Sequence, residues 1–305
     1  MKLSVVSSLY CSENYLDEFC RRSAAAAEKF AGSDYEIVLV NDGSPDGSLA
    51  KALALREADP RIKVIDLARN FGHHKALMTG IAEAAGDYVF LIDCDLEEAP
   101  ELLDGFAAEL AAHPEADVAY GVQPSRRGGL FERLGGRLFY ALMRHLTDFD
   151  YPADTLTARL MTRRYVDALK LFDDREYDLW VNFALAGFEQ RPLAAVKLDK
   201  QQSCYTLRRK IRHAVESITS SSAMPLYWIF FAGWAVLLVA VLHLVFIIVN
   251  KIFWDVPWGW SHIVASIWAL GGLIMISIGT VGIYLAKIFV ETKKRPAVII
   301  RRSYR

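Results

Sequence analysis

A short acidic segment holds the side chains best suited to chemistry in this chain. Its sequence, Asp93-Cys94-Asp95-Leu96-Glu97, follows an apolar run and places two carboxylates two residues apart. Like charges this close raise one another's pKa unless a cation neutralises them. Mg²⁺ or Mn²⁺ would do so, because these ions prefer oxygen ligands and can bridge to phosphate groups. A solvated acidic turn before the helix expected at Pro100 is the alternative, and the position directly after a buried strand favours the metal site.

Two further polar segments also follow apolar runs. In Asn41-Asp42-Gly43-Ser44, a carboxylate could accept hydrogen bonds from a base or a ribose while the glycine keeps the backbone close; a tight turn with an Asx cap is the alternative. Residues 68–75, with the sequence ARNFGHHK, open a helix and combine its N-terminus with basic groups, which favours an anion. A loop that only caps the helix is the alternative there, and the adjacent histidines lack the spacing of a zinc site.

The elements that must position these segments alternate along residues 1–122. Strands are expected at Leu3–Val6, Glu36–Val40, Lys63–Leu67, Tyr88–Ile92 and Val118–Tyr120, with helices at about Tyr15–Phe30, Ser48–Ala58, His74–Ala85 and Pro100–Ala112. Strands separated by helices imply a mostly parallel sheet, in which ligands bind at the carboxyl ends of the strands. The polar segments all stand at such ends. The sequence therefore predicts an α/β domain over residues 1–205, with a further helix at Ala168–Phe188.

An uneven distribution of charge divides the chain. Of its 305 residues, 35 are basic, 36 are acidic and 53% are hydrophobic, yet between Leu226 and Ala286 only Lys251 and Asp255 carry a formal charge. The uncharged runs at 226–249 and 262–286 are each long enough to cross a membrane as a helix. A buried helical hairpin in a soluble protein is the alternative.

The segments that flank these runs indicate an orientation. Residues 206–225 read as an amphipathic helix in the membrane interface, or else as an ordinary surface helix, and residues 287–305 read as a basic tail. Basic residues are far more frequent in the flanking segments than in the loop between the runs. The positive-inside rule therefore predicts a multi-pass protein of the inner membrane with two spans and both termini in the cytoplasm.

Composition excludes several other classes of protein. A formal net charge of −1 gives no sign of a nucleic-acid partner. The scattered cysteines Cys11, Cys20, Cys94 and Cys204 indicate a reducing compartment without structural zinc, and exclude a secreted disulfide scaffold. The N-terminal stretch does not have the pattern of a signal peptide.

Taken in order, the segments 41–44, 69–73 and 93–96 resemble the family 2 glycosyltransferases of the GT-A fold. The closer resemblance is to the polyprenyl-phosphate glycosyltransferases, bacterial two-span relatives of dolichol-phosphate mannose synthase, and it extends to residues 217–226 and 290–296. It implies a Rossmann-like, mostly parallel sheet and a metal-dependent, inverting transferase. The donor would be a nucleotide-sugar, more often UDP-linked, and the acceptor undecaprenyl phosphate or a similar polyprenyl phosphate at the cytoplasmic membrane face. Relatives also imply a homo-oligomer packed through the spans.

The resemblance implies roles for individual residues. Donor nucleotide binding is expected of Ser8, Tyr10, Glu13, Asp42, Gly43, Asn70, Lys75 and Asp93. A Mg²⁺ or Mn²⁺ ion on the donor diphosphate is expected to be held by Asp93, Asp95 and Glu97. Catalytic roles are implied for Asp95, Asp154 and Arg159. Acceptor phosphate binding is expected of Arg126, Arg133, Arg137, Tyr205 and Arg208.

The chain also departs from the family pattern. Thr157 stands where many members have an aspartate treated as the catalytic carboxylate, and Gln202-Ser203-Cys204-Tyr205 lacks the usual lysine. A hydroxyl nucleophile needs a general base, whereas a lipid monophosphate, with a second pKa of about 6, is already an anion at neutral pH. Thr157 therefore argues for a phosphate acceptor as much as it argues against catalysis. A transferase acting on another lipid-linked or hydroxyl acceptor and a non-catalytic membrane relative are the alternatives.

Overall fold

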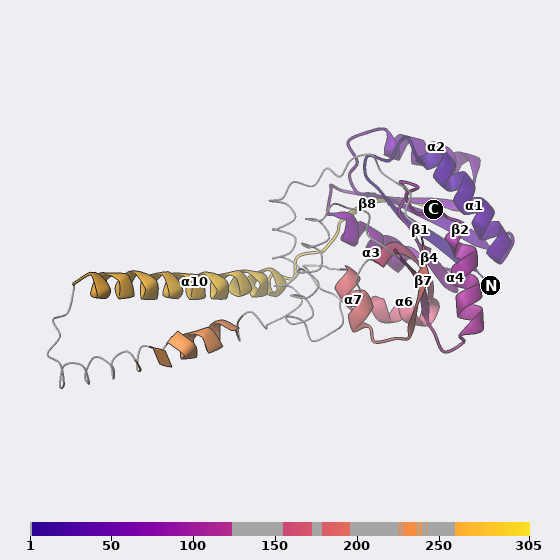
Figure 1. Ribbon diagram of the computed structural model, residues 1–305. Coiled ribbons are helices and arrows are strands. Elements are labelled where there is room, and N and C mark those ends of the chain that lie inside the picture. The colour runs from indigo at the N-terminus through magenta and orange to yellow at the C-terminus, as the bar shows by residue number, and fades with distance from the viewer. Residues whose placement is uncertain are drawn as a thin grey trace. The chain divides into compact units, whose positions relative to one another are not determined.

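The computed structural model describes residues 2–123, 155–172, 179–195 and 260–305, together with 226, 228–236, 238–239 and 242. The chain forms two compact units. The first comprises Met1–Ala141, Phe149–Thr206 and Arg295–Arg305, and the second Leu142–Asp148 and Leu207–Lys294. The first unit contains the sheet and the second contains the long helix α10 (Figure 1).

The first unit is built on an eight-stranded sheet with the strand order β7-β5-β6-β4-β1-β2-β3-β8. Its strands are β1 (Leu3–Leu9), β2 (Tyr35–Asn41), β3 (Ile62–Leu67), β4 (Tyr88–Leu91), β5 (Val118–Val122), β6 (Thr155–Thr162), β7 (Gln190–Ala194) and β8 (Ile300–Tyr304). The neighbours β3, β2, β1 and β4 run parallel, as do β5 and β7, while β6 and β8 run antiparallel to the strands beside them. This mixed, mostly parallel sheet is the GT-A-like α/β architecture that the resemblance implies.

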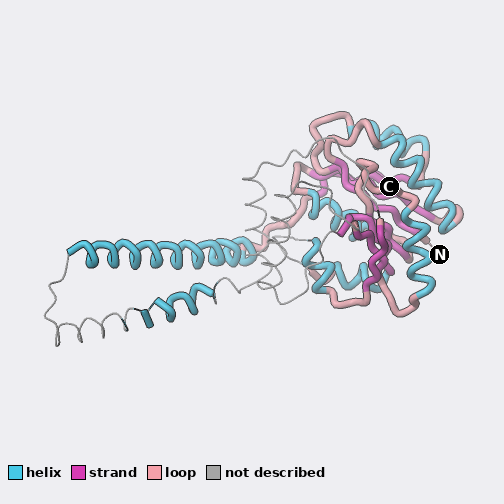
Figure 2. Tube along the Cα trace, in the orientation of Figure 1, coloured by secondary structure: helices cyan, strands magenta, loops and turns pink. Residues whose placement is uncertain are grey.

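Helices cover both faces of the sheet (Figure 2). They are α1 (Leu16–Ala31), α2 (Ser48–Ala58), α3 (His73–Glu83), α4 (Leu102–Ala112), α6 (Arg163–Leu169) and α7 (Leu179–Leu185). Because successive side chains of a strand point to opposite faces, Val5 packs in one buried cluster with Phe19 of α1 and Phe106 of α4. Its neighbour Val6 packs in the other, with Leu77 of α3 and Tyr165 of α6. The near-continuous apolar strands are therefore buried on both faces.

The carboxyl ends of the central parallel strands meet at one edge of the sheet. Leu9 at the end of β1 lies beside Asn41 at the end of β2, and Val6 pairs with Leu91 at the end of β4. Because β6 and β8 are antiparallel to β4 and β3, these two strands begin at that same edge. The edge thus brings together the polar segments after four strands and the first residues of two more.

The structure differs from the sequence prediction in several elements. Strands β6, β7 and β8 were not expected, and β8 lies within the segment interpreted as a basic tail. The helix expected at Ala168–Phe188 is wrong in its extent: α6 begins earlier, at Arg163, and residues 170–172 are not helical before α7 begins at Leu179. Strand β8 was missed because IRRSY has no apolar alternation; its pairing with β3 stabilises it.

The second unit contains α10 (Trp260–Thr292), which is longer than the run predicted at 262–286. Within the described residues, Leu270–Thr292 of α10 is the one segment long and apolar enough to cross a membrane, judged by length and composition. Its large apolar side chains, such as Met275 and Ile276, are exposed. Of the run at 226–249 the structure describes residues 226, 228–236, 238–239 and 242, all of them helical, and it describes none of 206–225. The first span and the interface helix stay predictions.

Candidate active site

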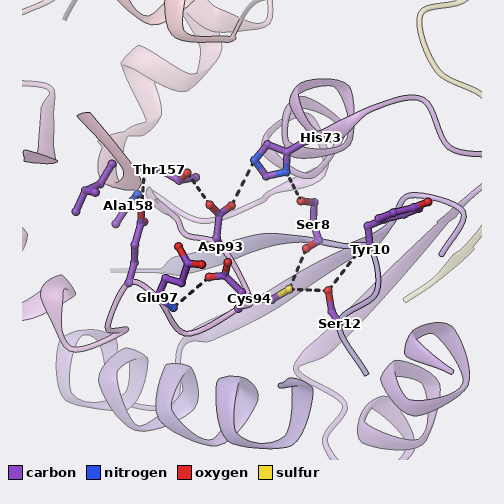
Figure 3. Close-up of polar contacts among 12 residues, drawn as sticks. Ser8, Tyr10, Ser12, His73, Asp93, Cys94, Glu97, Thr157 and Ala158 are labelled. Carbon is purple, nitrogen blue, oxygen red and sulfur yellow. Dashed lines mark hydrogen bonds and ion pairs between the residues drawn. The ribbon is translucent and has the colours of Figure 1, made fainter. Parts of the chain in front are cut away.

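Asp93, two residues after β4, is the centre of a chain of polar contacts (Figure 3). The Thr157 hydroxyl donates a hydrogen bond to Asp93 Oδ2 over 2.8 Å. On the other side, His73 Nε2 lies 3.4 Å from Asp93 Oδ1, and His73 Nδ1 lies 3.0 Å from Ser8 Oγ. These contacts bring β1, the first residue of α3, the segment after β4 and β6 together. Only Oδ2 of Asp93 is hydrogen-bonded, by Thr157, and the buried Oδ1 has no hydrogen-bond partner in the part of the chain that the structure describes.

Glu98 explains why Thr157 reaches Asp93. Its carboxylate is buried and accepts hydrogen bonds from the backbone N–H of Thr157 over 3.0 Å and of Ala158 over 2.7 Å. Buried backbone N–H groups need such acceptors, and here a side chain supplies them near the start of a strand. Glu98 therefore fixes the position of β6 relative to the segment that follows β4.

The Thr157–Asp93 contact gives the departure at residue 157 a physical meaning. A carboxylate at this position would stand directly against Asp93 and raise the pKa of one of the two groups unless a cation intervened. A hydroxyl can instead donate to Asp93 and leave its charge in place.

Arg159, which the resemblance places among the catalytic residues, is 2% exposed. Its guanidinium lies over the rings of Phe183, at 3.6 Å, and Trp180, at 4.9 Å, both from α7. Burial lowers its pKa to about 10. A cation enclosed in this way joins β6 to α7. The catalytic role expected of Arg159 stays a prediction.

The segment after β2 is attached to the segment after β3 through Asp42 and through the close approach of Gly43. The Asp42 carboxylate is buried, and its two oxygens accept hydrogen bonds from the backbone N–H of Phe71 (2.7 Å) and Gly72 (3.0 Å). Burial raises the pKa of Asp42, and the two hydrogen bonds oppose that rise. Gly43 has φ +60°, and a Cβ there would lie 2.5 Å from the backbone nitrogen of Asn70. Asp42 is therefore engaged in holding the loop that was expected to surround a nucleotide.

The loop after β1 is attached to the turn after β2. Glu13 Oε2 accepts a hydrogen bond from the N–H of Gly47 over 3.0 Å, and the N–H of Glu13 donates to Asp46. Desolvation alone would raise the pKa of Asp46, but hydrogen bonds from Ser44, Ser48 and the backbone lower it to about 2. Tyr10 beside this turn keeps 53% of its surface exposed.

Cys94, between the two aspartates, faces the interior. Its sulfur lies 3.2 Å from Ser8 O and 3.0 Å from Ser12 Oγ, within hydrogen-bond reach of both. Burial raises the pKa of the thiol to about 12, so Cys94 is a packing residue and not a nucleophile.

The acidic segment offers carboxylates that suit a divalent cation, although they do not form a closed cluster. Asp95 Oδ1 accepts the N–H of Glu97 over 3.1 Å across a turn in which Leu96 has φ +60°. Within the described residues no three or more His, Cys, Asp or Glu side chains are grouped to hold a metal, so the expected three-residue set of Asp93, Asp95 and Glu97 is not assembled. Two aspartates are nevertheless an appropriate donor set for Mg²⁺, which commonly takes one or two carboxylates and completes its shell with phosphate and water.

Comparison with known proteins places the chain in a family. The model of "Glycosyl transferase family 2" matches residues 4–170. Over its whole length the chain is 44% identical to a Mycobacterium tuberculosis (strain CDC 1551 / Oshkosh) protein named "Putative glycosyltransferases", of which it covers 89%. The chain belongs to glycosyl transferase family 2. It is therefore a glycosyltransferase.

Two further similarities were found for this glycosyltransferase. It is 30% identical to the "Prophage bactoprenol glucosyl transferase homolog" of Escherichia coli (strain K12), with 99% of each chain covered. A solved mannosyltransferase from Pyrobaculum calidifontis, in complex with GDP-Man and Mn²⁺, matches with a TM-score of 0.48 and 16% identity, covering 95% of this chain and 84% of that one.

Some of the expected site residues of this glycosyltransferase lie within the described part of the structure, and others lie outside it. Ser8 lies in β1, one residue before its end, and the other described donor-site and metal residues lie in segments that follow strands ending at one edge of the sheet. Asn70 is exposed, and Lys75 lies in the first turn of α3. The expected residues Asp154, Arg126, Arg133, Arg137, Tyr205 and Arg208 lie outside the described residues. Their roles stay predictions.

Sequence reasoning missed three residues that shape the site. His73 was noted as part of a motif but not as a partner of Asp93, and its position at the start of α3 was the available signal. Thr157 was noted as a replacement, without the hydrogen bond that it makes. Glu98 carried no signal, because nothing in the sequence shows that its carboxylate turns inward to β6.

Proposed function

We propose that this glycosyltransferase transfers a sugar, with inversion, from a nucleotide-sugar to undecaprenyl phosphate or a similar polyprenyl phosphate. The transfer takes place at the cytoplasmic face of the inner membrane. The observation that carries the proposal is the Thr157 hydroxyl donating to Asp93 where family members often have an aspartate. The printed name of the Escherichia coli relative, which refers to bactoprenol, supports the same acceptor class.

The acceptor argument rests on proton chemistry. A threonine that donates its hydrogen to Asp93 does not act as a general base, so a sugar hydroxyl would lack a proton acceptor at this position. A lipid monophosphate needs none, because it is already an anion at neutral pH. What it requires is alignment with the donor and nearby positive charge. We assign that charge to Arg126, Arg133, Arg137 and Arg208, with Tyr205 beside the phosphate.

The donor argument rests on the loops at the sheet edge. Tyr10 is exposed and can stack on a nucleotide base, while Ser8, Glu13 and Asn70 offer polar groups from neighbouring loops. The N-terminus of α3 and Lys75 favour the diphosphate. UDP is the expected nucleotide. Asp42 and Gly43 contribute by holding these loops together.

Asp93 and Asp95 are the residues that would hold Mg²⁺ or Mn²⁺, with Glu97 beside them. Such an ion, when bound, supplies positive charge to the leaving diphosphate. The protein's own part is to keep Asp93 oriented through Thr157 and His73. Asp154 is proposed as a further carboxylate of the reaction centre.

The membrane arrangement completes the proposal. Two spans, at 226–249 and 262–286, and an interface helix at 206–225 would keep the sheet edge near the lipid headgroup, with both termini cytoplasmic. The apolar, exposed surface of α10 supports membrane insertion. A homo-oligomer packed through the spans is part of the proposal.

The test is the substitution Asp95→Asn in the full-length protein. Removing this carboxylate is expected to abolish sugar transfer to polyprenyl phosphate that depends on Mg²⁺ or Mn²⁺. Asp104→Asn, at a surface carboxylate paired with Lys29, is the matched control and should keep full activity. Full activity of Asp95→Asn would overturn the metal assignment.

A further inference from the structure

Strand β8, which follows α10 in the chain, begins at the sheet edge where the loops proposed to bind the nucleotide also lie. These loops, at residues 41–48 and 68–72, are called the donor loops. Ile300 pairs with Leu67 at the end of β3, and Tyr304 pairs with Val64 deeper in the sheet. The expected basic tail is therefore built into the sheet beside the segment at 68–72. Only residues 293–299 separate β8 from the end of α10.

The residues around β8 hold the first residue of that segment on both of its backbone groups. The N–H of Ala68 donates to Ile299 O over 2.9 Å. The Arg301 guanidinium donates through Nη2 to Ala68 O over 2.6 Å. Since Phe71 and Gly72 in the same segment are bonded to Asp42, fixing Ala68 fixes one side of the donor loops.

Arg301 also reaches the other side of the donor loops. Its Nη1 lies 3.2 Å from Oδ2 of the buried Asp66, whose Oδ1 accepts a hydrogen bond from Asn41 Nδ2 over 2.8 Å. Asn41 Oδ1 in turn accepts the N–H of Ser44 over 3.3 Å. A buried carboxylate requires a cation and hydrogen-bond donors, and Arg301 and Asn41 supply them.

These contacts continue from Ser44 to the loop after β1. Ser44 Oγ accepts the N–H of Cys11 over 2.8 Å, next to the exposed Tyr10. A continuous series of hydrogen bonds therefore runs from Arg301 through Asp66, Asn41 and Ser44 to the backbone beside Tyr10.

We propose that β8 is required to assemble the donor site. Arg301 is the residue through which β8 positions the loops that bind the nucleotide. The identity of the donor rests on the proposed function. A strand that follows the membrane helix in the chain thus determines whether the donor loops are assembled. Undocking β8 from β3 leaves Ala68 and Asp66 without these partners and loosens the loops at 41–48 and 68–72.

The test compares Arg301→Ala with Arg302→Ala in the full-length protein in lipid nanodiscs. Arg302 is the matched control, because it is exposed in the same strand and its guanidinium lies over the ring of Tyr304. For Arg301→Ala the KM for the nucleotide-sugar is expected to rise about threefold to tenfold, since a partly exposed, charge-assisted contact is lost. The KM for polyprenyl phosphate should not change. Arg301→Lys keeps the positive charge but replaces the forked guanidinium with a single ammonium group. Its KM for the nucleotide-sugar should therefore lie between those of wild type and Arg301→Ala.

Hydrogen–deuterium exchange supplies a readout that does not depend on the donor. Arg301→Ala should speed amide exchange at 68–72 and at Ser44, whereas Arg302→Ala should not. If wild-type protein binds no nucleotide-sugar but this exchange pattern holds, the proposed function fails and the loop-positioning role of Arg301 stands. If Arg301→Ala matches Arg302→Ala in both donor KM and exchange, or raises both KM values alike, the proposal is overturned.

Discussion

Removing the Thr157 hydroxyl is the sharpest perturbation of the site. Thr157→Val replaces the hydroxyl with a methyl group of similar volume, so it deletes the 2.8 Å hydrogen bond to Asp93 and retains the bulk of the side chain. The backbone N–H of residue 157 still donates to Glu98, which keeps β6 in place. The nearest described contact that then remains to the Asp93 carboxylate is His73 Nε2, 3.4 Å from Oδ1.

The expected size of the effect follows from the nature of this hydrogen bond. A hydrogen bond to a charged group contributes about 1.5–3 kcal/mol. The Asp93 side chain keeps 20% of its surface exposed, so water can replace part of the lost interaction and the lower limit applies. About 1.5 kcal/mol corresponds to roughly a tenfold change in a binding constant. Partners that orient a metal-binding carboxylate commonly contribute about 10- to 100-fold to metal affinity.

The assay is a Mn²⁺ titration of the detergent-solubilised protein, followed by electron paramagnetic resonance. Thr157→Val should bind Mn²⁺ about tenfold more weakly than wild type, and transfer should recover when the metal is saturating. Thr157→Ser, which keeps the hydroxyl, is the control and should bind Mn²⁺ like wild type. Equal Mn²⁺ affinity in Thr157→Val and wild type would refute the reasoning.

Other predictions concern the loops and the cysteines. Gly43→Ala should raise the donor KM and lower the unfolding temperature more than Gly32→Ala, because both glycines have φ near +60° but only at Gly43 would a Cβ collide with backbone atoms; equal effects on both measures would contradict the close contact. Asp46 has a pKa lowered to about 2 from 3.8, so its contribution to stability is present above pH 4 and lost as the pH falls toward 2. Thermal unfolding of Asp46→Asn against wild type should show that this part of the pH dependence is gone, and parallel pH profiles would argue against it. In native protein iodoacetamide should label the exposed Cys11 and spare the buried Cys94, as read by peptide mass spectrometry, and rapid labelling of Cys94 would disprove its burial.

Much of the fold was predictable because its signal is local. The apolar runs that became β1 to β5 are buried on both faces of the sheet, and the polar segments after them stand at one edge, as the parallel arrangement requires. Strand β8 was not predictable in this way. Its sequence, IRRSY, has no alternation of apolar and polar residues, and its pairing partner β3 is more than two hundred residues away in the chain.

The candidate site was predictable in its residue types but not in its contacts. The spacing of Asp93 and Asp95 indicated a carboxylate pair, and the structure places them at the expected edge. The partners of Asp93 come from Thr157 and His73, and these depend on how β6 and α3 approach β4. Arg159 illustrates the limit: its motif position gave no sign that its guanidinium lies over the aromatic rings of α7.

The most direct test of the central claim is the chemical identity of the product. Purified full-length protein is incubated with nucleotide-sugars, undecaprenyl phosphate and Mg²⁺ or Mn²⁺, and the lipid fraction is analysed by tandem mass spectrometry. We predict one sugar bonded to the lipid phosphate, with fragmentation between sugar and phosphate, and no such product with Asp95→Asn. A sugar bonded to a lipid hydroxyl, or nucleotide release without any glycosylated lipid phosphate, would contradict the account.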